Sequence, residues 1–172
     1  MIVDTEIIGR SLPTGKIEKR TLEKSPDLLP GFTLWVRFRS DNGHIWYTCL
    51  SGRHGEIVLS KTFRRILIKT TNTLYLIDAL NEKLIGKIPD FKGLITLSPM
   101  DELLVIHEGE FYRVIDNFEN TDKVRSPIPI EVTELHRWDD KILYFEALDI
   151  KQWHTPAEFY LDTGNWTITK IK

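Results

Sequence analysis

The sequence lacks the features that mark several large classes of protein. It has 172 residues and one cysteine, Cys49, so it can form no disulfide within the chain and no multi-cysteine metal site. No apolar run approaches the roughly 20 residues needed to cross a bilayer. The first ten residues lack the charged and apolar regions of a secretory signal. We therefore expect a cytoplasmic protein without a membrane partner.

Catalytic motifs are equally scarce. The chain contains no P-loop, no dinucleotide fingerprint and no nucleophile elbow. No two of its histidines have the spacing of metal ligands on one strand or helix. We expect no catalytic residue, no metal and no cofactor, and an enzyme whose site is assembled from separated strands is the third alternative for function. The histidines are His44, His54, His107, His136 and His154.

Two pairs of adjacent carboxylates and the lone thiol have structural interpretations. Asp101-Glu102 and Asp139-Asp140 would serve glycoside hydrolysis only if they faced each other across a cleft. Both pairs sit at predicted turns, where aspartate bonds the backbone. Cys49 lies in an alternating apolar strand, which is typical of a small buried side chain. A reactive thiol is the alternative, because Arg53 and His54 are close in sequence.

The net charge of -2 hides an asymmetry along the chain. Residues 1–69 carry 12 Lys/Arg and 7 Asp/Glu, a net of +5, and residues 70–172 carry 11 and 18, a net of -7. Within the second part, residues 101–149 carry 5 and 13, a net of -8. An acidic patch of this size would steer a basic partner and repel nucleic acid. The alternative is a solvated acidic surface that keeps the protein soluble.

The dominant periodicity is two, which indicates β-strands. Residues 32–39 and 44–50 alternate clearly, and Asn42-Gly43 between them predicts a tight hairpin with two positive-φ residues. Each strand together with its turn takes about ten residues, which is typical of an antiparallel all-β protein. Further strands are expected at Glu56–Ser60, Arg65–Lys69, Thr73–Asp78, Leu84–Ile88, Leu94–Ser98, Leu103–His107, Glu110–Asp116, Ile130–Leu135, Lys141–Leu148, Ala157–Asp162 and Trp166–Ile171.

Two segments do not alternate. Residues 11–30 are polar and contain three prolines, which predicts an irregular loop with a short helix over Ile17–Lys24, capped by Thr14. Residues 117–129 form a second irregular stretch. Long loops in compact domains are often functional, or else disordered.

One short pattern recurs in the second part of the chain. A strand that ends in aspartate is followed by a polar turn and another apolar strand, at Asp78, Asp116 and Asp162. The spacings are 38 and 46 residues, close to the length of one propeller blade. Over roughly residues 60–172 this pattern resembles blades of WD-repeat and related β-propellers. The Trp-Asp dipeptide itself occurs once, at Trp138-Asp139.

Three architectures follow for a single β-rich domain over residues 1–172. The first is a small propeller-like array of meander blades, and the alternatives are a β-sandwich and a partly open barrel. At about 40 residues per blade the chain holds at most four blades. All three are mostly antiparallel.

A basic group in the first part of the chain is a candidate nucleic-acid site. A groove lined with basic and aromatic residues would bind single strands, but a pI near 6.2 argues against a nucleic-acid partner. Of five tryptophans we expect most in the core, and one or two exposed ones would mark a recognition surface. The basic group is Arg53, His54, Lys61, Phe63, Arg64, Arg65 and Lys69.

The sequence favours a non-catalytic protein-binding domain, in its most specific form an inhibitor or immunity-type protein that neutralises a basic toxin such as a nuclease. Carboxylates would imitate phosphates and give fast, steered association. The alternative is a propeller-like scaffold or assembly module that forms a homodimer. The expected partner-binding residues are Asp101, Glu102, Glu108, Glu110, Asp116, Glu119, Asp122, Asp139 and Asp140.

Overall fold

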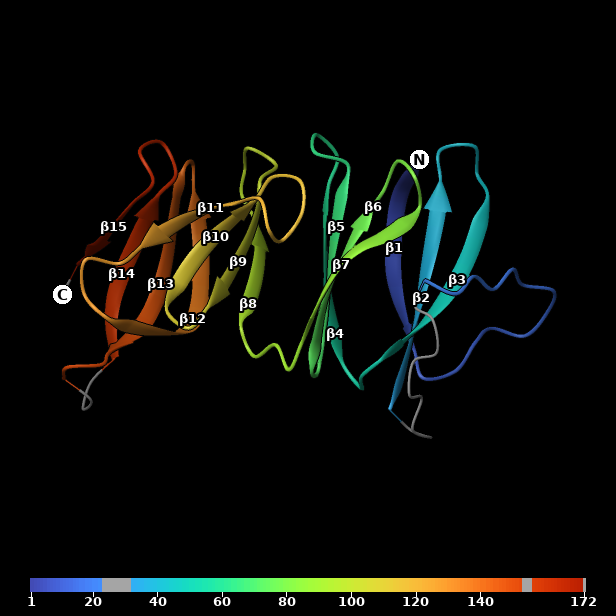
Figure 1. Cartoon of the computed structure of the whole chain (residues 1–172), viewed down its shortest axis with the longest axis horizontal. Coiled ribbons are helices and arrows are strands. Elements are labelled where there is room, and N and C mark those ends of the chain that lie inside the picture. Colours follow the sequence, from blue (N-terminus) through green and yellow to red (C-terminus); the bar gives the residue numbers. More distant parts are fainter. Residues whose placement is uncertain (23–31, 153–155, 172) are drawn as a thin grey trace. The chain divides into compact units, whose positions relative to one another are not determined.

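The computed structural model describes residues 1–22, 32–152 and 156–171 of the chain. Within these ranges it has fifteen strands and no helix. The strands form four open sheets, one of three strands and three of four, and all strand pairs are antiparallel (Figure 1). The predicted all-β, mostly antiparallel fold is confirmed, and none of the four sheets formed by the described residues closes on itself into a barrel.

The chain divides into two compact units, Met1–Lys92 (unit 1) and Gly93–Lys172 (unit 2). Each consists of two sheets, and the single domain over residues 1–172 stays a prediction. Unit 1 carries 15 Lys/Arg and 10 Asp/Glu, a net of +5, and unit 2 carries 8 and 15, a net of -7. The charge asymmetry of the sequence therefore coincides with the boundary between the units.

Sheet A of unit 1 has the order β1-β2-β3. Its strands are β1 (Ile2–Gly9), β2 (Thr33–Ser40) and β3 (Ile45–Ser51), and β1 was not expected from the sequence. The β2–β3 hairpin is confirmed, but only Gly43 has a positive φ, of 82°. The amide of Gly43 donates to the Ser40 carbonyl at 2.9 Å, which closes a turn over residues 40–43. Gly43, the last residue of this turn, is left-handed, whereas the sequence predicted two central residues with positive φ.

The short helix predicted over Ile17–Lys24 is wrong for residues 17–22, and residues 23–24 lie outside the described ranges. Lys19 instead forms a parallel bridge with Tyr47. The Tyr47 amide donates to the Glu18 carbonyl at 2.9 Å, and the Arg20 amide donates to the Tyr47 carbonyl at 2.8 Å. The free edge of β3 offers backbone partners that an isolated turn of helix lacks, so this segment lies extended along sheet A.

Sheet B of unit 1 is a four-stranded meander that packs face to face on sheet A. Its strands are β4 (Gly55–Ser60), β5 (Arg65–Thr70), β6 (Thr73–Asp78) and β7 (Lys83–Pro89). The shared core contains the stacked rings of Phe38 and Trp46, whose centroids are 4.3 Å apart. Tyr75 of sheet B lies fully buried in the same core.

Unit 2 repeats this plan with two four-stranded meanders. Sheet C contains β8 (Leu94–Leu97), β9 (Leu103–His107), β10 (Glu110–Val114) and β11 (Thr121–Arg125). Sheet D contains β12 (Ile130–Asp139), β13 (Ile142–Asp149), β14 (Pro156–Asp162) and β15 (Thr167–Lys170). Their shared core includes the rings of Phe111, Phe145 and Phe159.

Strand β11 lies inside the stretch 117–129 that the sequence predicts to be irregular. Of its five residues only Val124 is buried, so it shows no apolar alternation. It forms because β10 offers a free edge, on which Val114 pairs with Thr121 and Glu110 with Arg125.

The recurring pattern of the sequence marks the third strand of each four-stranded sheet. Asp78 and Asp162 each end such a strand, and each accepts turn amides through Oδ1, from Leu80 at 2.9 Å and from Gly164 at 2.7 Å. In sheet C this role passes from Asp116 to Asn117, whose Oδ1 accepts the amide of Asn120 at 2.7 Å. Each unit is two packed meanders, which fits the expected array of blades and, for one unit taken alone, the sandwich.

Candidate functional site

Most of the predicted partner-binding carboxylates gather at one end of unit 2, where β8 meets β9, β10 meets β11, β12 meets β13 and β14 meets β15 (Figure 1). Contacts between the two sheets hold these turns together. The Trp138 Nε1 donates to Thr96 Oγ1 at 3.2 Å, and the Arg113 guanidinium lies 5.3 Å from the Trp166 ring. We call this region the acidic end; it carries Asp101, Glu102, Asp116, Glu119, Asp122, Asp139, Asp140 and Asp162.

Two of these carboxylates are neutralised by one cation. The Arg113 guanidinium contacts Glu102 at 2.9 Å and Asp122 at 3.4 Å. Of the described residues, Glu119, Asp139 and Asp140 are exposed and form no ion pair. Besides Arg113, the cation near these turns is Lys141, which is exposed and forms no ion pair with the described residues. The acidic end thus presents more negative than positive charge to solvent.

Two predicted residues lie away from the acidic end. Glu108 is in the β9–β10 turn at the opposite end of sheet C, with a side chain 83% exposed. Glu110 pairs with Lys123, accepts the Tyr112 hydroxyl at 2.6 Å and lies 3.8 Å from Arg125. The hydrogen bonds from Lys123 and then Tyr112 lower the pKa of Glu110. Its charge is satisfied within sheet C, so it does not join the others.

The turns themselves hold the two predicted carboxylate pairs. Asp101 and Asp140 both have left-handed backbones, with φ of 64° and 49°. The Glu102 amide donates to Ser98 Oγ at 3.0 Å, which fixes the β8–β9 turn. These positions are typical of turn aspartates, as expected from the sequence.

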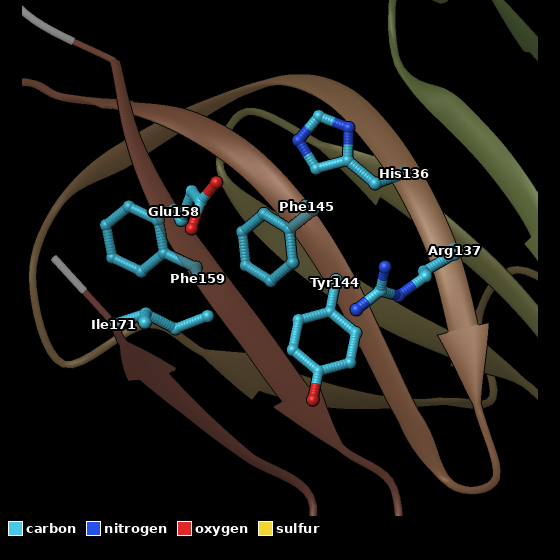
Figure 2. Close-up of a pocket in the computed structure, with 7 residues that line it drawn as sticks. All are labelled: His136, Arg137, Tyr144, Phe145, Glu158, Phe159 and Ile171. Atoms are coloured by element: carbon cyan, nitrogen blue, oxygen red, sulfur yellow. The ribbon is translucent and has the colours of Figure 1, made fainter.

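A hollow of about 440 Å³ lies on sheet D (Figure 2). It is lined by polar side chains together with the buried Phe145 and Phe159. Among the described residues that line it there is no serine, threonine or cysteine nucleophile. Tyrosine and arginine, here Tyr144 and Arg137, are enriched at protein interfaces. The polar and exposed lining residues are His136, Arg137, Tyr144, Glu158 and Ile171.

Sequence reasoning missed three carboxylates beside this hollow. In the register of sheet D, Glu134 of β12 lies opposite Glu146 of β13, which lies opposite Glu158 of β14. Their even spacing of 12 residues does not by itself reveal this arrangement, because the register shifts of β12 decide which of its residues faces Glu146. We call these three residues the glutamate row.

The remaining sequence candidates are dispersed. Burial raises the pKa of Cys49, which argues against a reactive thiolate at neutral pH. The basic group is split between two ends of sheet B: Arg64 lies in the β4–β5 turn, whereas the Arg53 amide binds Thr71 Oγ1 at 3.0 Å beyond the other end. Trp153 and His154 lie outside the described residues.

In the ranges 1–22, 32–152 and 156–171, no three His, Cys, Asp or Glu side chains are arranged to hold a metal ion. Across those same ranges the chain forms no helix long and apolar enough to cross a membrane.

Comparisons with known proteins identify no family for this chain. No protein-family model and no curated protein matches it. The extracellular domain of the putative one component system BT4673 from B. thetaiotaomicron is similar in structure, with a TM-score of 0.51 and 10% identity over 84% of this chain and 23% of that chain. Dihydro-heme d1 dehydrogenase NirN in complex with DHE gives a TM-score of 0.45 and 12% identity, over 81% and 44%. The chain spans less than half of either neighbour. The first likeness concerns the fold alone, and an all-β neighbour is compatible with the resemblance to propellers.

Proposed function

We propose that this chain is a non-catalytic protein-binding domain that holds a basic protein against the acidic end of unit 2. One observation carries the proposal: Glu119, Asp139 and Asp140 are exposed and unpaired among the described residues, on turns that the fold fixes. Unpaired carboxylates on rigid turns attract a cationic surface without first breaking ion pairs of their own.

The most specific version of this proposal is an inhibitor or immunity-type protein. A basic toxin that acts on a phosphate backbone has a cationic site, and a rigid set of carboxylates competes for such a site. The net charge of -7 on unit 2 would steer the encounter and make association fast at low salt.

The test is quantitative affinity capture from the native cell lysate at low and high salt, with mass spectrometry of the retained proteins. The test variant combines Glu119→Lys, Asp139→Lys and Asp140→Lys. Lysine is tolerable at residue 140, because Arg64 and Glu82 adopt the same left-handed backbone in this molecule. We expect one basic protein retained stoichiometrically by the natural chain, weakened by salt and at least about tenfold weaker on the variant.

A matched control separates the position of the charges from their number. The combination Glu56→Lys, Glu108→Lys and Glu131→Lys changes the net charge equally, at exposed positions that are not part of the acidic end. It is expected to keep the partner. Equal retention on the natural chain and the test variant would reject the acidic end as the binding site.

A further inference from the structure

The side of sheet D that faces away from sheet C carries the glutamate row. Leu143, Phe145 and Ala147 of β13 point into the core shared with sheet C, so Tyr144 and Glu146 point the other way. Like charges directly opposite each other on neighbouring strands are destabilising. The row places two such pairs side by side on β12, β13 and β14. Cations that cover the glutamate row would offset this repulsion and stabilise the sheet.

Aromatic side chains lie in the next position along the same surface. Tyr144 and Tyr160 pair across β13 and β14 with ring centroids 6.4 Å apart, and the Arg137 guanidinium lies 5.0 Å from the Tyr144 ring. Tyrosine and arginine are the residues that most often anchor protein interfaces. We call this surface face D; it comprises Glu134, Arg137, Tyr144, Glu146, Glu158 and Tyr160.

The side of sheet A that faces away from sheet B has the complementary character. Leu34, Val36 and Phe38 of β2 are buried, so the residues between them point away from that core. Those residues and their cross-strand neighbours combine aromatic rings with cations. We call this surface face A; it comprises Asp4, Glu6, Lys19, Trp35, Arg37, Arg39 and Tyr47.

Face A has more cations than carboxylates. Arg37 contacts Glu6 at 2.9 Å and Asp4 at 3.4 Å, and Arg39 contacts Asp4 at 3.3 Å. Lys19 lies 5.7 Å from the Trp35 ring and forms no ion pair with the residues that the structure describes. The face thus sets three cations against two carboxylates, whereas face D sets three carboxylates against one guanidinium.

We propose that face D of one copy of this chain binds face A of a second copy. Both faces present aromatic and arginine anchors, and their excess charges are opposite. The units that carry them have net charges of -7 and +5, so unit 2 of one copy attracts unit 1 of another, whereas two like units repel. The contact is head-to-tail, and such contacts close into rings or continue as open chains.

The proposal goes beyond the acidic end and its basic partner, and it is tested on the full chain alone. Analytical ultracentrifugation over a protein concentration series measures self-association at low and at high salt. We expect dimers or larger species at tens of micromolar, with association weakened at least about tenfold by high salt. A chain that sediments as a monomer throughout at low salt would overturn the proposal.

Complementary charge reversals test the pairing of the two faces. Glu158→Lys on face D and Arg39→Glu on face A should each reduce self-association about tenfold or more. An equimolar mixture of the two variants should associate again. In the mixed pair, one contact joins two natural faces, and the other joins the two substituted faces, whose charges at residues 158 and 39 have been exchanged. If the mixture stays as weak as the separate variants, the faces do not pair.

Two controls separate this contact from the proposed basic-partner site. Glu108→Lys makes the same charge change in an exposed turn outside both faces and should leave self-association within about twofold. The triple acidic-end variant should lose the basic partner but still self-associate. If that variant loses self-association while Glu158→Lys keeps it, the second copy binds at the acidic end and the assignment to face D is wrong.

Discussion

Units 1 and 2 share a plan of two packed meander sheets but use their charges differently. In unit 1 a carboxylate is drawn inward to join segments: Glu82 binds Arg20 and accepts the Ser40 hydroxyl at 2.5 Å. It thereby ties the β6–β7 turn to sheet A and to the extended segment beside it. In unit 2 Glu119, Asp139 and Asp140 stay on turns without such partners among the described residues. The comparison distinguishes a carboxylate that stabilises the fold from carboxylates that are exposed to a partner.

Gly109 of unit 2 and Gly43 of unit 1 differ in how closely their turns approach other residues, and this difference gives the largest expected effect. A Cβ at Gly109, in the β9–β10 turn, would lie 1.9 Å from the Ile130 carbonyl oxygen of sheet D. Sheet C would have to separate from sheet D to admit it. We expect Gly109→Ala to lower the free energy of unfolding of unit 2 by about 3 kcal/mol or more, measured by chemical denaturation.

Gly43 in unit 1 supplies the matched control. It also has a positive φ, of 82°, but a Cβ there would meet nothing within 4 Å. Gly43→Ala should therefore lose only the backbone contribution, about 1 kcal/mol. Hydrogen exchange should show faster opening of β9 and β12 in the first variant and of β2 and β3 in the second. Equal losses in the two variants would mean that the approach of Gly109 to Ile130 does not hold the sheets together.

The inward carboxylate of unit 1 should appear as a dependence of stability on pH. Burial raises the pKa of Glu82, but hydrogen bonds from Ser40 and Arg20 outweigh it and hold the pKa below the ordinary value of 4.5. Its contribution is therefore complete above pH 4.5 and lost as the pH falls through the lower, folded-state pKa. At pH 7 Glu82→Gln should lower the free energy of unfolding by about 1 to 3 kcal/mol, since hydrogen bonds to a charged group are lost.

The difference in free energy of unfolding between Glu82→Gln and the natural chain should shrink steadily towards zero in acid. Protonation of Glu82 then removes the same charge from the natural protein. Glu56→Gln is the control in the same unit: Glu56 pairs with Lys69 at 3.6 Å but is 58% exposed. It should change stability by less than about 1 kcal/mol. A constant difference across the acid range would show that the carboxylate charge of Glu82 is not what ties the segments.

The smallest expected effect has the opposite sign. Glu146→Gln removes the middle charge of the glutamate row but keeps an oxygen to accept the Thr133 hydroxyl, which lies 3.1 Å away. We expect the monomer to gain about 0.2 to 1 kcal/mol in stability at low salt and to lose the gain at high salt. Thermal unfolding in dilute solution measures this. The same variant should associate with itself less tightly, so a change that stabilises the fold would weaken its contact.

Much of the fold could be predicted from the sequence, because buried strands leave an alternating pattern. The β2–β3 hairpin and the strands of sheets B and D follow from that alternation and from Asn-Gly and Asp turns. The strands β1 and β11 escaped because their side chains do not alternate between buried and exposed positions. Val124 is the only buried residue of β11, and β1 has mixed exposure along its length. Strands without such alternation form on a neighbouring strand that periodicity does not reveal.

The sequence predicted that this stretch is acidic, but it did not predict how the carboxylates are arranged or which of them form ion pairs. Counting residues identified the acidic stretch, yet it treated Glu102 and Asp122 like Asp139, although Arg113 neutralises the first two. The glutamate row escaped because facing neighbours depend on register. Two irregular positions in β12 shift that register, so the pairing of Glu134 with Glu146 could not be read from alternation alone.

Those two irregularities have a further consequence for β12, the longest of the strands that the structure describes. β12 spans ten residues at an edge of sheet D, and its register shifts place β-bulges at Thr133 and His136. A long regular edge would offer its unpaired amides and carbonyls as a template for strands of other chains, the first step towards amyloid. Bulges twist the edge and interrupt that template. The irregular strand therefore offers a poorer template for fibril growth than a regular edge of the same length would.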